Sequence, residues 1–282
     1  MYHNNYKIEN TINLDAHPCF SDPNTFPNFQ EKLLSFKTHL KQLVDDKASA
    51  TFYKFGDGDY RFLKQESIGS AAPGIRALSK SYEDIDHERF REGAQKCNYY
   101  TCEIYPENIK MFSEVIDNDI TYPAEYVYGL VANKWFFETF KGRIGLIGAS
   151  EKLSVIEELM QHAEYQEYLG LSSFSDYIHF PQKYAADDLD LVEKFVGDQL
   201  TNATADIFLL GIGHAKSGLL HTFTKYKKSV YLDVGAGIDM IAGCINIRRP
   251  FAGNWINYRL QDYDYSDIDY LRYRGEGIHR TL

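Results

Sequence analysis

The sequence predicts a single domain of the α/β class, in which helices flank a largely parallel sheet. Three apolar runs predict it, because each closes on glycine or small residues and is followed by an amphipathic segment. Such strand-turn-helix units build parallel sheets. The runs cover residues 143–150, 206–213 and 229–237. Together they are typical of a Rossmann-like arrangement.

The composition excludes several other classes of protein. A chain of 282 residues that is 44% hydrophobic and 15% aromatic can bury a full core, which excludes disordered chains and disulfide-stapled small folds. A formal charge of −10 disfavours nucleic acid as a partner. No stretch reaches the roughly 20 apolar residues of a membrane span, and the start lacks a signal-peptide pattern. We therefore expect a soluble, cytoplasmic protein. A homo-oligomer is compatible with these observations.

Residue periodicity predicts the other elements in chain order. Helical spacing of apolar residues and aromatic or β-branched runs are the two signals used. Helices are expected at 26–46, 60–63, 82–98, 107–117, 132–140, 151–162, 187–200 and 215–226, and further strands at 50–55 and 177–180. The middle part, between 82 and 140, shows no compact strand signal. Residues 1–24 are expected to form a polar N-terminal arm, 25–260 the α/β domain, and 261–282 a Tyr-rich C-terminal tail.

The first candidate site is the turn Phe55-Gly56-Asp57-Gly58-Asp59. Two carboxylates two residues apart in a glycine-bracketed turn can face one cation, and hard divalent ions prefer such oxygen ligands. Mn²⁺ or Mg²⁺ held by Asp57 and Asp59 would offset the charge of a departing diphosphate. The alternative is an Asx turn in which Asp and Gly make only the bend.

The second candidate is the pair of glycine-ended strands at 211–214 and 148–150. Ligands of open α/β sheets bind beyond the carboxyl ends of the strands, where unpaired backbone N–H groups receive phosphate. His214 and Lys216 follow Gly211 and Gly213 and could meet a phosphate or a sugar hydroxyl. Tight turns and solvated side chains are the alternatives for these residues.

The third candidate is the segment from Leu232 to Asp239, with Asp233, Gly235 and Asp239 at a turn. It is similar to the first motif of S-adenosylmethionine-dependent methyltransferases, but only 43 residues follow Asp239, so most of the sheet would have to precede it in a permuted order. Methyl transfer is therefore the second hypothesis. The preferred hypothesis is a site for a sugar substrate, in which a carboxylate of this turn binds sugar hydroxyls or takes a proton from an acceptor. Helix capping is the structural alternative.

Taken in order, the Phe-Gly-Asp-Gly-Asp turn, the strand that closes on 211–213 and the last strand with its Asp-x-Gly-x-Gly turn resemble the GT-D-type glycosyltransferases. The resemblance spans roughly residues 50–249 and is thin between 67 and 141. In that family the early Asp-x-Asp or Asp-x-Glu element binds the divalent metal and the nucleotide sugar. Its second acid is usually Glu, where this chain has the shorter Asp59.

The resemblance implies a metal-dependent glycosyltransferase that moves a hexosyl or pentosyl group from a nucleoside diphosphate donor, with UDP favoured, to a glycan or another hydroxyl acceptor. A non-catalytic nucleotide- or sugar-binding module and a structural protein are further alternatives. The expected roles are metal binding by Asp57 and Asp59, nucleotide binding by Gly56, Gly58, Gly211, Gly213, His214, Lys216 and Gly235, and catalysis by Asp233 and Asp239.

Overall fold

The structure is a computed structural model, and it describes residues 29–65, 85–131, 134–181 and 185–243. Within these residues, seven strands form one sheet in the order β3-β2-β1-β7-β6-β4-β5, and every neighbouring pair is parallel. The carboxyl ends of all the strands therefore lie along one edge. The strands are β1 Ala50–Phe55, β2 Tyr99–Cys102, β3 Tyr122–Pro123, β4 Ile144–Ala149, β5 Asp176–Phe180, β6 Ile207–Gly211 and β7 Val230–Asp233.

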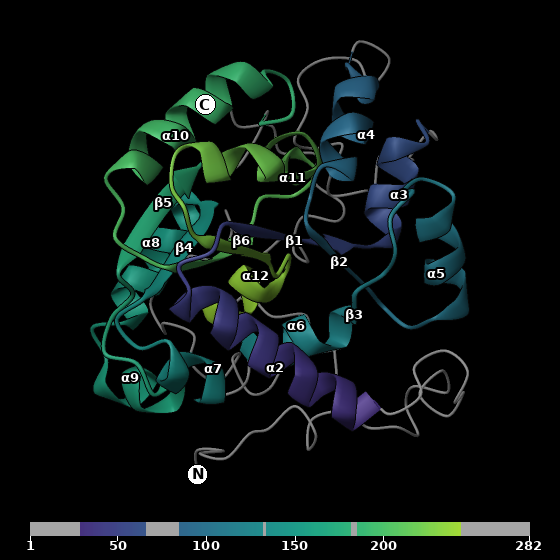
Figure 1. Cartoon of the computed structure of the whole chain (residues 1–282). Coiled ribbons are helices and arrows are strands. Elements are labelled where there is room, and N and C mark those ends of the chain that lie inside the picture. Colours follow the sequence, from purple (N-terminus) through teal and green to yellow (C-terminus); the bar gives the residue numbers. More distant parts are fainter. Residues whose placement is uncertain (1–28, 66–84, 132–133, 182–184, 244–282) are drawn as a thin grey trace.

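Helices cover both faces of this sheet, which gives a three-layer α/β/α arrangement (Figure 1). Alternate strand residues pack toward opposite layers; Phe52, for example, belongs to one core and Tyr53 to the other. One face carries α2 Phe29–Asp45, α6 Ala124–Val131, α7 Lys134–Thr139, α8 Ser150–Leu159, α9 Ala163–Leu169 and α12 Gly237–Ile241. The other carries α3 Asp57–Leu63, α4 His87–Gln95, α5 Pro106–Ser113, α10 Leu189–Thr201, α11 Ala215–Leu219 and the 3₁₀ helix η5 Leu220–Lys225.

The predicted fold class is confirmed, and so are the strands expected from apolar runs. The absence of strands in the middle of the chain was a wrong prediction, because β2 and β3 lie there. Both are short, and β2 has the sequence Tyr-Tyr-Thr-Cys without an aliphatic residue. The predicted arm at 1–24 and tail at 261–282 lie outside the described residues. Across the parts that the structure describes, no helix is both long and apolar enough to span a membrane.

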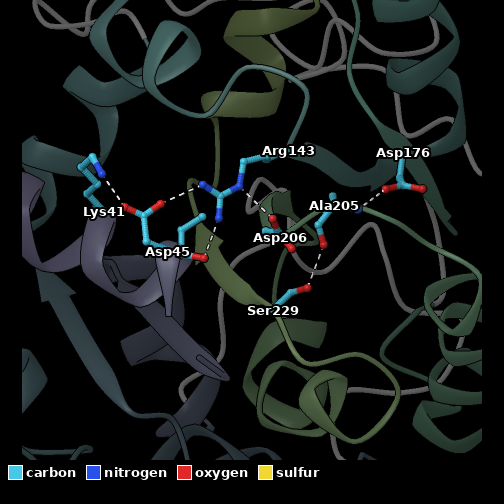
Figure 2. A network of polar contacts seen from close by, with 8 residues as sticks. Lys41, Asp45, Arg143, Asp176, Ala205, Asp206 and Ser229 are labelled. Atoms are coloured by element: carbon cyan, nitrogen blue, oxygen red, sulfur yellow. Dashed lines mark hydrogen bonds and ion pairs between the residues drawn. The ribbon is translucent and has the colours of Figure 1, made fainter. Parts of the chain in front are cut away.

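Polar contacts join several elements at the amino ends of the strands (Figure 2). The guanidinium of Arg143, just before β4, donates to Asp45 at 2.8 Å and to Asp206, just before β6, at 2.7 Å. Arg143 also donates to the carbonyl of Val44 at 2.7 Å. The Ser229 hydroxyl before β7 donates to the Ala205 carbonyl at 2.9 Å. These contacts fix the edge of the sheet opposite the one that carries the three candidate motifs.

Candidate functional site

A buried ammonium group joins all three candidate motifs at the carboxyl edge of the sheet. Lys216 is the second residue of α11, which follows β6, and it is 5% exposed. Its Nζ lies 3.0 Å from Asp59 Oδ2 in the first motif and 2.8 Å from Asp233 Oδ2 in the third. It also donates to the main-chain carbonyl of Lys54 in β1 and lies 4.7 Å from the centre of the Tyr53 ring. Residues more than 150 positions apart in sequence therefore meet at one cation.

Asp59 is oriented by the start of α3. The predicted turn is the first turn of this helix, which begins at Asp57 rather than near residue 60. Asp59 stands at the third position, and its Oδ2 accepts the Gly56 backbone N–H at 2.9 Å, as an acid at this position of a helix often does. Asp59 is also buried, at 6% exposure.

Asp233 ends β7 and is nearly enclosed, at 1% exposure. Its Oδ2 accepts the Lys54 backbone N–H at 3.2 Å, and its Oδ1 accepts the Gly235 N–H at 2.9 Å. Gly235 has φ +50, and a Cβ there would lie 2.9 Å from the Lys54 Cε. The backbone conformation of this turn therefore favours glycine, and a side chain here would also require the end of Lys54 to move.

Neighbouring charges determine the protonation states of Asp59 and Lys216. Burial by itself raises the pKa of the Asp59 carboxyl, but Lys216, His214 and Lys54 outweigh burial and hold that pKa well below its usual range. Burial lowers the pKa of the Lys216 ammonium, whereas Asp233 and Asp59 more than compensate and raise it. Asp59 is thus an anion and Lys216 a cation at neutral pH.

The turn after β6 lies beside this cluster. A Cβ on Gly211 would lie 2.5 Å from the Gly235 carbonyl oxygen, so the turns after β6 and β7 pack closely. Gly213 has φ +58, is exposed, and has open space where a side chain would be. The His214 ring stacks on Phe62 at 4.5 Å, and its Nδ1 lies 3.7 Å from Asp59 Oδ1. The second motif therefore offers exposed backbone next to a buried ion cluster.

Asp239 occupies a different position along the same edge. It lies in α12, is 7% exposed and forms an ion pair with Lys152 in α8, which follows β4. No hydrogen bond or ion pair described for Asp239 connects it to Lys216. The ends of β1, β6 and β7 thus share one charged cluster, and the ends of β4 and β7 flank a second ion pair.

The two acids proposed as metal ligands have different surroundings. Residues two apart on a helix do not face each other, and Asp57 is exposed while Asp59 is buried. Asp59 already contacts an ammonium group and a backbone N–H. Within the ranges described, no three or more His, Cys, Asp and Glu side chains are grouped to hold a metal ion. These donors do not fit a shared site for Mn²⁺ or Mg²⁺. Metal binding by Asp57 and Asp59 therefore stays a prediction that this geometry does not support.

No protein-family model matches the chain, and no curated protein matches it. The chain is similar to a solved structure, "A New Glycosyltransferase (DUF1792) from Streptococcus sanguinis". The similarity covers 72% of this chain and 80% of that one, with a TM-score of 0.46 and 12% sequence identity.

Sequence reasoning missed two residues of this edge, Lys54 and Lys152. Lys54 is 7% exposed, and its Nζ would lie 3.7 Å from a Cβ at Gly56 and 3.8 Å from one at Gly235. A lysine inside the aromatic run of β1 was the available signal, because a charged residue in a buried strand needs a partner. Lys152 gave no comparable signal, since a lysine in the first turn of an amphipathic helix is ordinary.

Proposed function

We propose that this protein is a glycosyltransferase that moves a sugar from a nucleoside diphosphate donor to a hydroxyl group of a glycan or another acceptor. One observation carries the proposal: Lys216 joins Asp59 and Asp233, so the three motifs that resemble the GT-D-type enzymes meet at one place. That place is the carboxyl edge of a parallel sheet, where ligands of such folds bind. UDP as the nucleotide and a hexosyl or pentosyl group as the sugar remain finer predictions.

The backbone at Gly211 and Gly213 is proposed to receive the donor diphosphate. Gly213 is exposed, and its positive φ turns the chain away from the path of β6. Unpaired N–H groups at such turns receive phosphate oxygens. His214 and Gly58 lie together here, since a Cβ on Gly58 would be 3.5 Å from the His214 ring. The nucleotide would therefore lie over the first and second motifs.

The two acids predicted to serve the acceptor receive separate roles. Each carboxylate oxygen of Asp233 accepts a backbone N–H, and Oδ2 also contacts the Lys216 ammonium. We therefore propose that Asp233 positions the other groups of the cluster. Asp239 keeps the predicted catalytic role. In the transfer step the acceptor oxygen bonds to the anomeric carbon, the bond to the diphosphate oxygen breaks, and the acceptor proton passes to Asp239. The nucleoside diphosphate leaves with the bonding electrons.

A thermal-shift panel tests this function against its alternatives. UDP-sugars, other nucleotide sugars and S-adenosylmethionine are added separately to the wild-type protein, and nucleoside diphosphate release is followed in parallel. A glycosyltransferase is stabilised by a nucleotide sugar and releases the diphosphate when an acceptor is present. Stabilisation by S-adenosylmethionine alone would support the methyltransferase hypothesis. Stabilisation by a nucleotide sugar without any release across an acceptor panel would support a binding module.

A further inference from the structure

Three oxygen atoms converge on the Lys216 ammonium. They are Asp59 Oδ2 at 3.0 Å, Asp233 Oδ2 at 2.8 Å and the main-chain carbonyl oxygen of Lys54. Two carboxylates and a carbonyl are the ligand types that hard divalent cations take from proteins. The Lys216 side chain is 7% exposed and the Asp59 side chain 8% exposed, so the three oxygens surround a cation largely shielded from water.

We propose that the Lys216 ammonium occupies the cation position of this site, so that the protein contains a built-in cation where its sequence predicts a divalent metal ion. The proposal rests on the proposed function and deepens it. The site then needs no metal at Asp59, because its negative charges are already matched within the chain.

The charges around the cluster support this assignment. Asp59 and Asp233 supply two negative charges, and Lys216 and Lys54 supply two positive ones. A Cβ on Gly56 would lie 3.7 Å from the Lys54 Nζ and 3.8 Å from Asp59 Oδ2, so the ammonium of Lys54 and the carboxylate of Asp59 lie beside the same backbone position. A divalent ion on the same oxygens would have to displace Lys216 or lie against it, and two cations at such separations repel strongly in a buried site. Lys216 and a metal ion at Asp59 are thus mutually exclusive.

The arrangement has a consequence that can be measured without substrate. Removing the ammonium leaves two buried carboxylates and a carbonyl aimed at one point, and uncompensated buried charge is strongly unfavourable. A metal ion can restore the balance. Lys216→Met should therefore create a metal site that the wild-type protein lacks.

The test is a titration of Mn²⁺ followed by electron paramagnetic resonance, with and without UDP. The wild-type protein is compared with Lys216→Met, Asp59→Asn and Asp57→Asn. Lys152→Met is the matched control, since it removes a lysine from the other ion pair of this edge. Melting curves with and without Mn²⁺ are recorded for every variant, so that a loss of folding is seen directly.

The expected result is that Lys216→Met gains one bound Mn²⁺ per chain and melts at a higher temperature with Mn²⁺, and that Lys152→Met gains neither. The wild-type protein and Asp59→Asn should bind the same amount of Mn²⁺, because Asp59 holds no Mn²⁺ in the wild-type protein. This comparison tests the proposal even if Lys216→Met does not fold. An ion lost in Asp57→Asn but retained in Asp59→Asn lies on Asp57 and agrees with the proposal. Wild-type Mn²⁺ binding that Asp59→Asn abolishes, with or without UDP, would overturn it. Because the titrations with Mn²⁺ alone require no nucleotide, they remain informative if the proposed function fails.

Discussion

Glu125 shows how one buried side chain acquires an unusual charge state. It stands in the first turn of α6, and its Oε1 accepts the Ile104 N–H at 3.2 Å. Its Oε2 is buried and has no hydrogen-bond partner within the described residues. Burial, with Glu103 nearby, raises the pKa of the Glu125 carboxyl to about 8. The side chain is therefore largely protonated at pH 7, unlike Asp59, whose cationic neighbours keep it ionised.

Glu125 should make stability depend on pH in the neutral range. The unfolded chain releases this proton near pH 4.5 and the folded chain near pH 8, so the favourable contribution is complete below pH 4.5 and is lost as the pH rises toward 8. The loss is on the order of a few kcal/mol. Glu125→Gln keeps the acceptor for Ile104 and should remove this decline. Urea unfolding of both proteins at pH 5 and pH 8 measures it; equal pH dependence in the two proteins would contradict the assignment.

At the scale of elements, the position of Lys216 depends on how α11 packs against α4. Gly93 in α4 makes the contact so close that a Cβ there would lie 2.3 Å from the Ser217 carbonyl oxygen. The Ser217 hydroxyl also lies 2.7 Å from the Tyr53 hydroxyl of β1. The helix that carries the cation is thus held from two sides, by α4 and by β1.

Gly93→Ala should separate α4 from α11, because the added methyl group meets backbone that cannot rotate away. We expect a loss of about 1–3 kcal/mol in the free energy of unfolding and a fall in catalytic rate as Lys216 shifts. Gly58→Ala in α3 is the control, since its Cβ would make an ordinary contact of 3.5 Å with the His214 ring. Chemical denaturation provides the comparison. If Gly93→Ala proves as stable as Gly58→Ala, the close approach of the two helices is not as described.

Elements with long apolar runs were predictable, and short or polar ones were not. The apolar run Ile207–Gly211 predicted β6, and the strand is buried almost throughout. The two-residue β3 left no period to detect, and its pairing with β2 decides its conformation. Glycines at 56 and 58 favoured a turn, but Asp59 accepts the Gly56 N–H and allows α3 to begin at once. Such helix starts depend on a side-chain contact that residue spacing does not reveal.

Over the whole molecule, the amino and carboxyl edges of the sheet carry different kinds of contacts. The amino edge carries the contacts of Arg143, which link α2, β4 and β6 (Figure 2). The carboxyl edge gathers Lys54, Asp59, Lys216 and Asp233. That the motifs end at this edge was predictable, because parallel strands align their carboxyl ends. The ion pairs of Lys216 were not predictable, since they depend on the order of β1, β7 and β6 in the sheet.

This difference between the two edges predicts that Arg143→Met affects stability without affecting the chemistry. The substitution removes three hydrogen bonds of the guanidinium and leaves the Asp206 carboxylate, one-quarter exposed, without its cation. The melting temperature should fall, while the rate of diphosphate release measured well below it should equal that of the wild-type protein. Calorimetry and a rate assay on the same preparation check both parts. A reduced rate in a fully folded Arg143→Met protein would show that the edges are coupled.

The role of the cluster around Lys216 is tested most directly by the rate of UDP release from a panel of UDP-sugars. The rate is measured for the wild-type protein and for Lys216→Met, both shown to be folded. We predict measurable release by the wild-type protein and a loss of about 100-fold or more in the variant, since a fixed charge in a buried site is worth roughly that much in rate. No release from any donor by the wild-type protein, or an unchanged rate in Lys216→Met, would contradict the claim that the cluster around Lys216 is the site of glycosyl transfer.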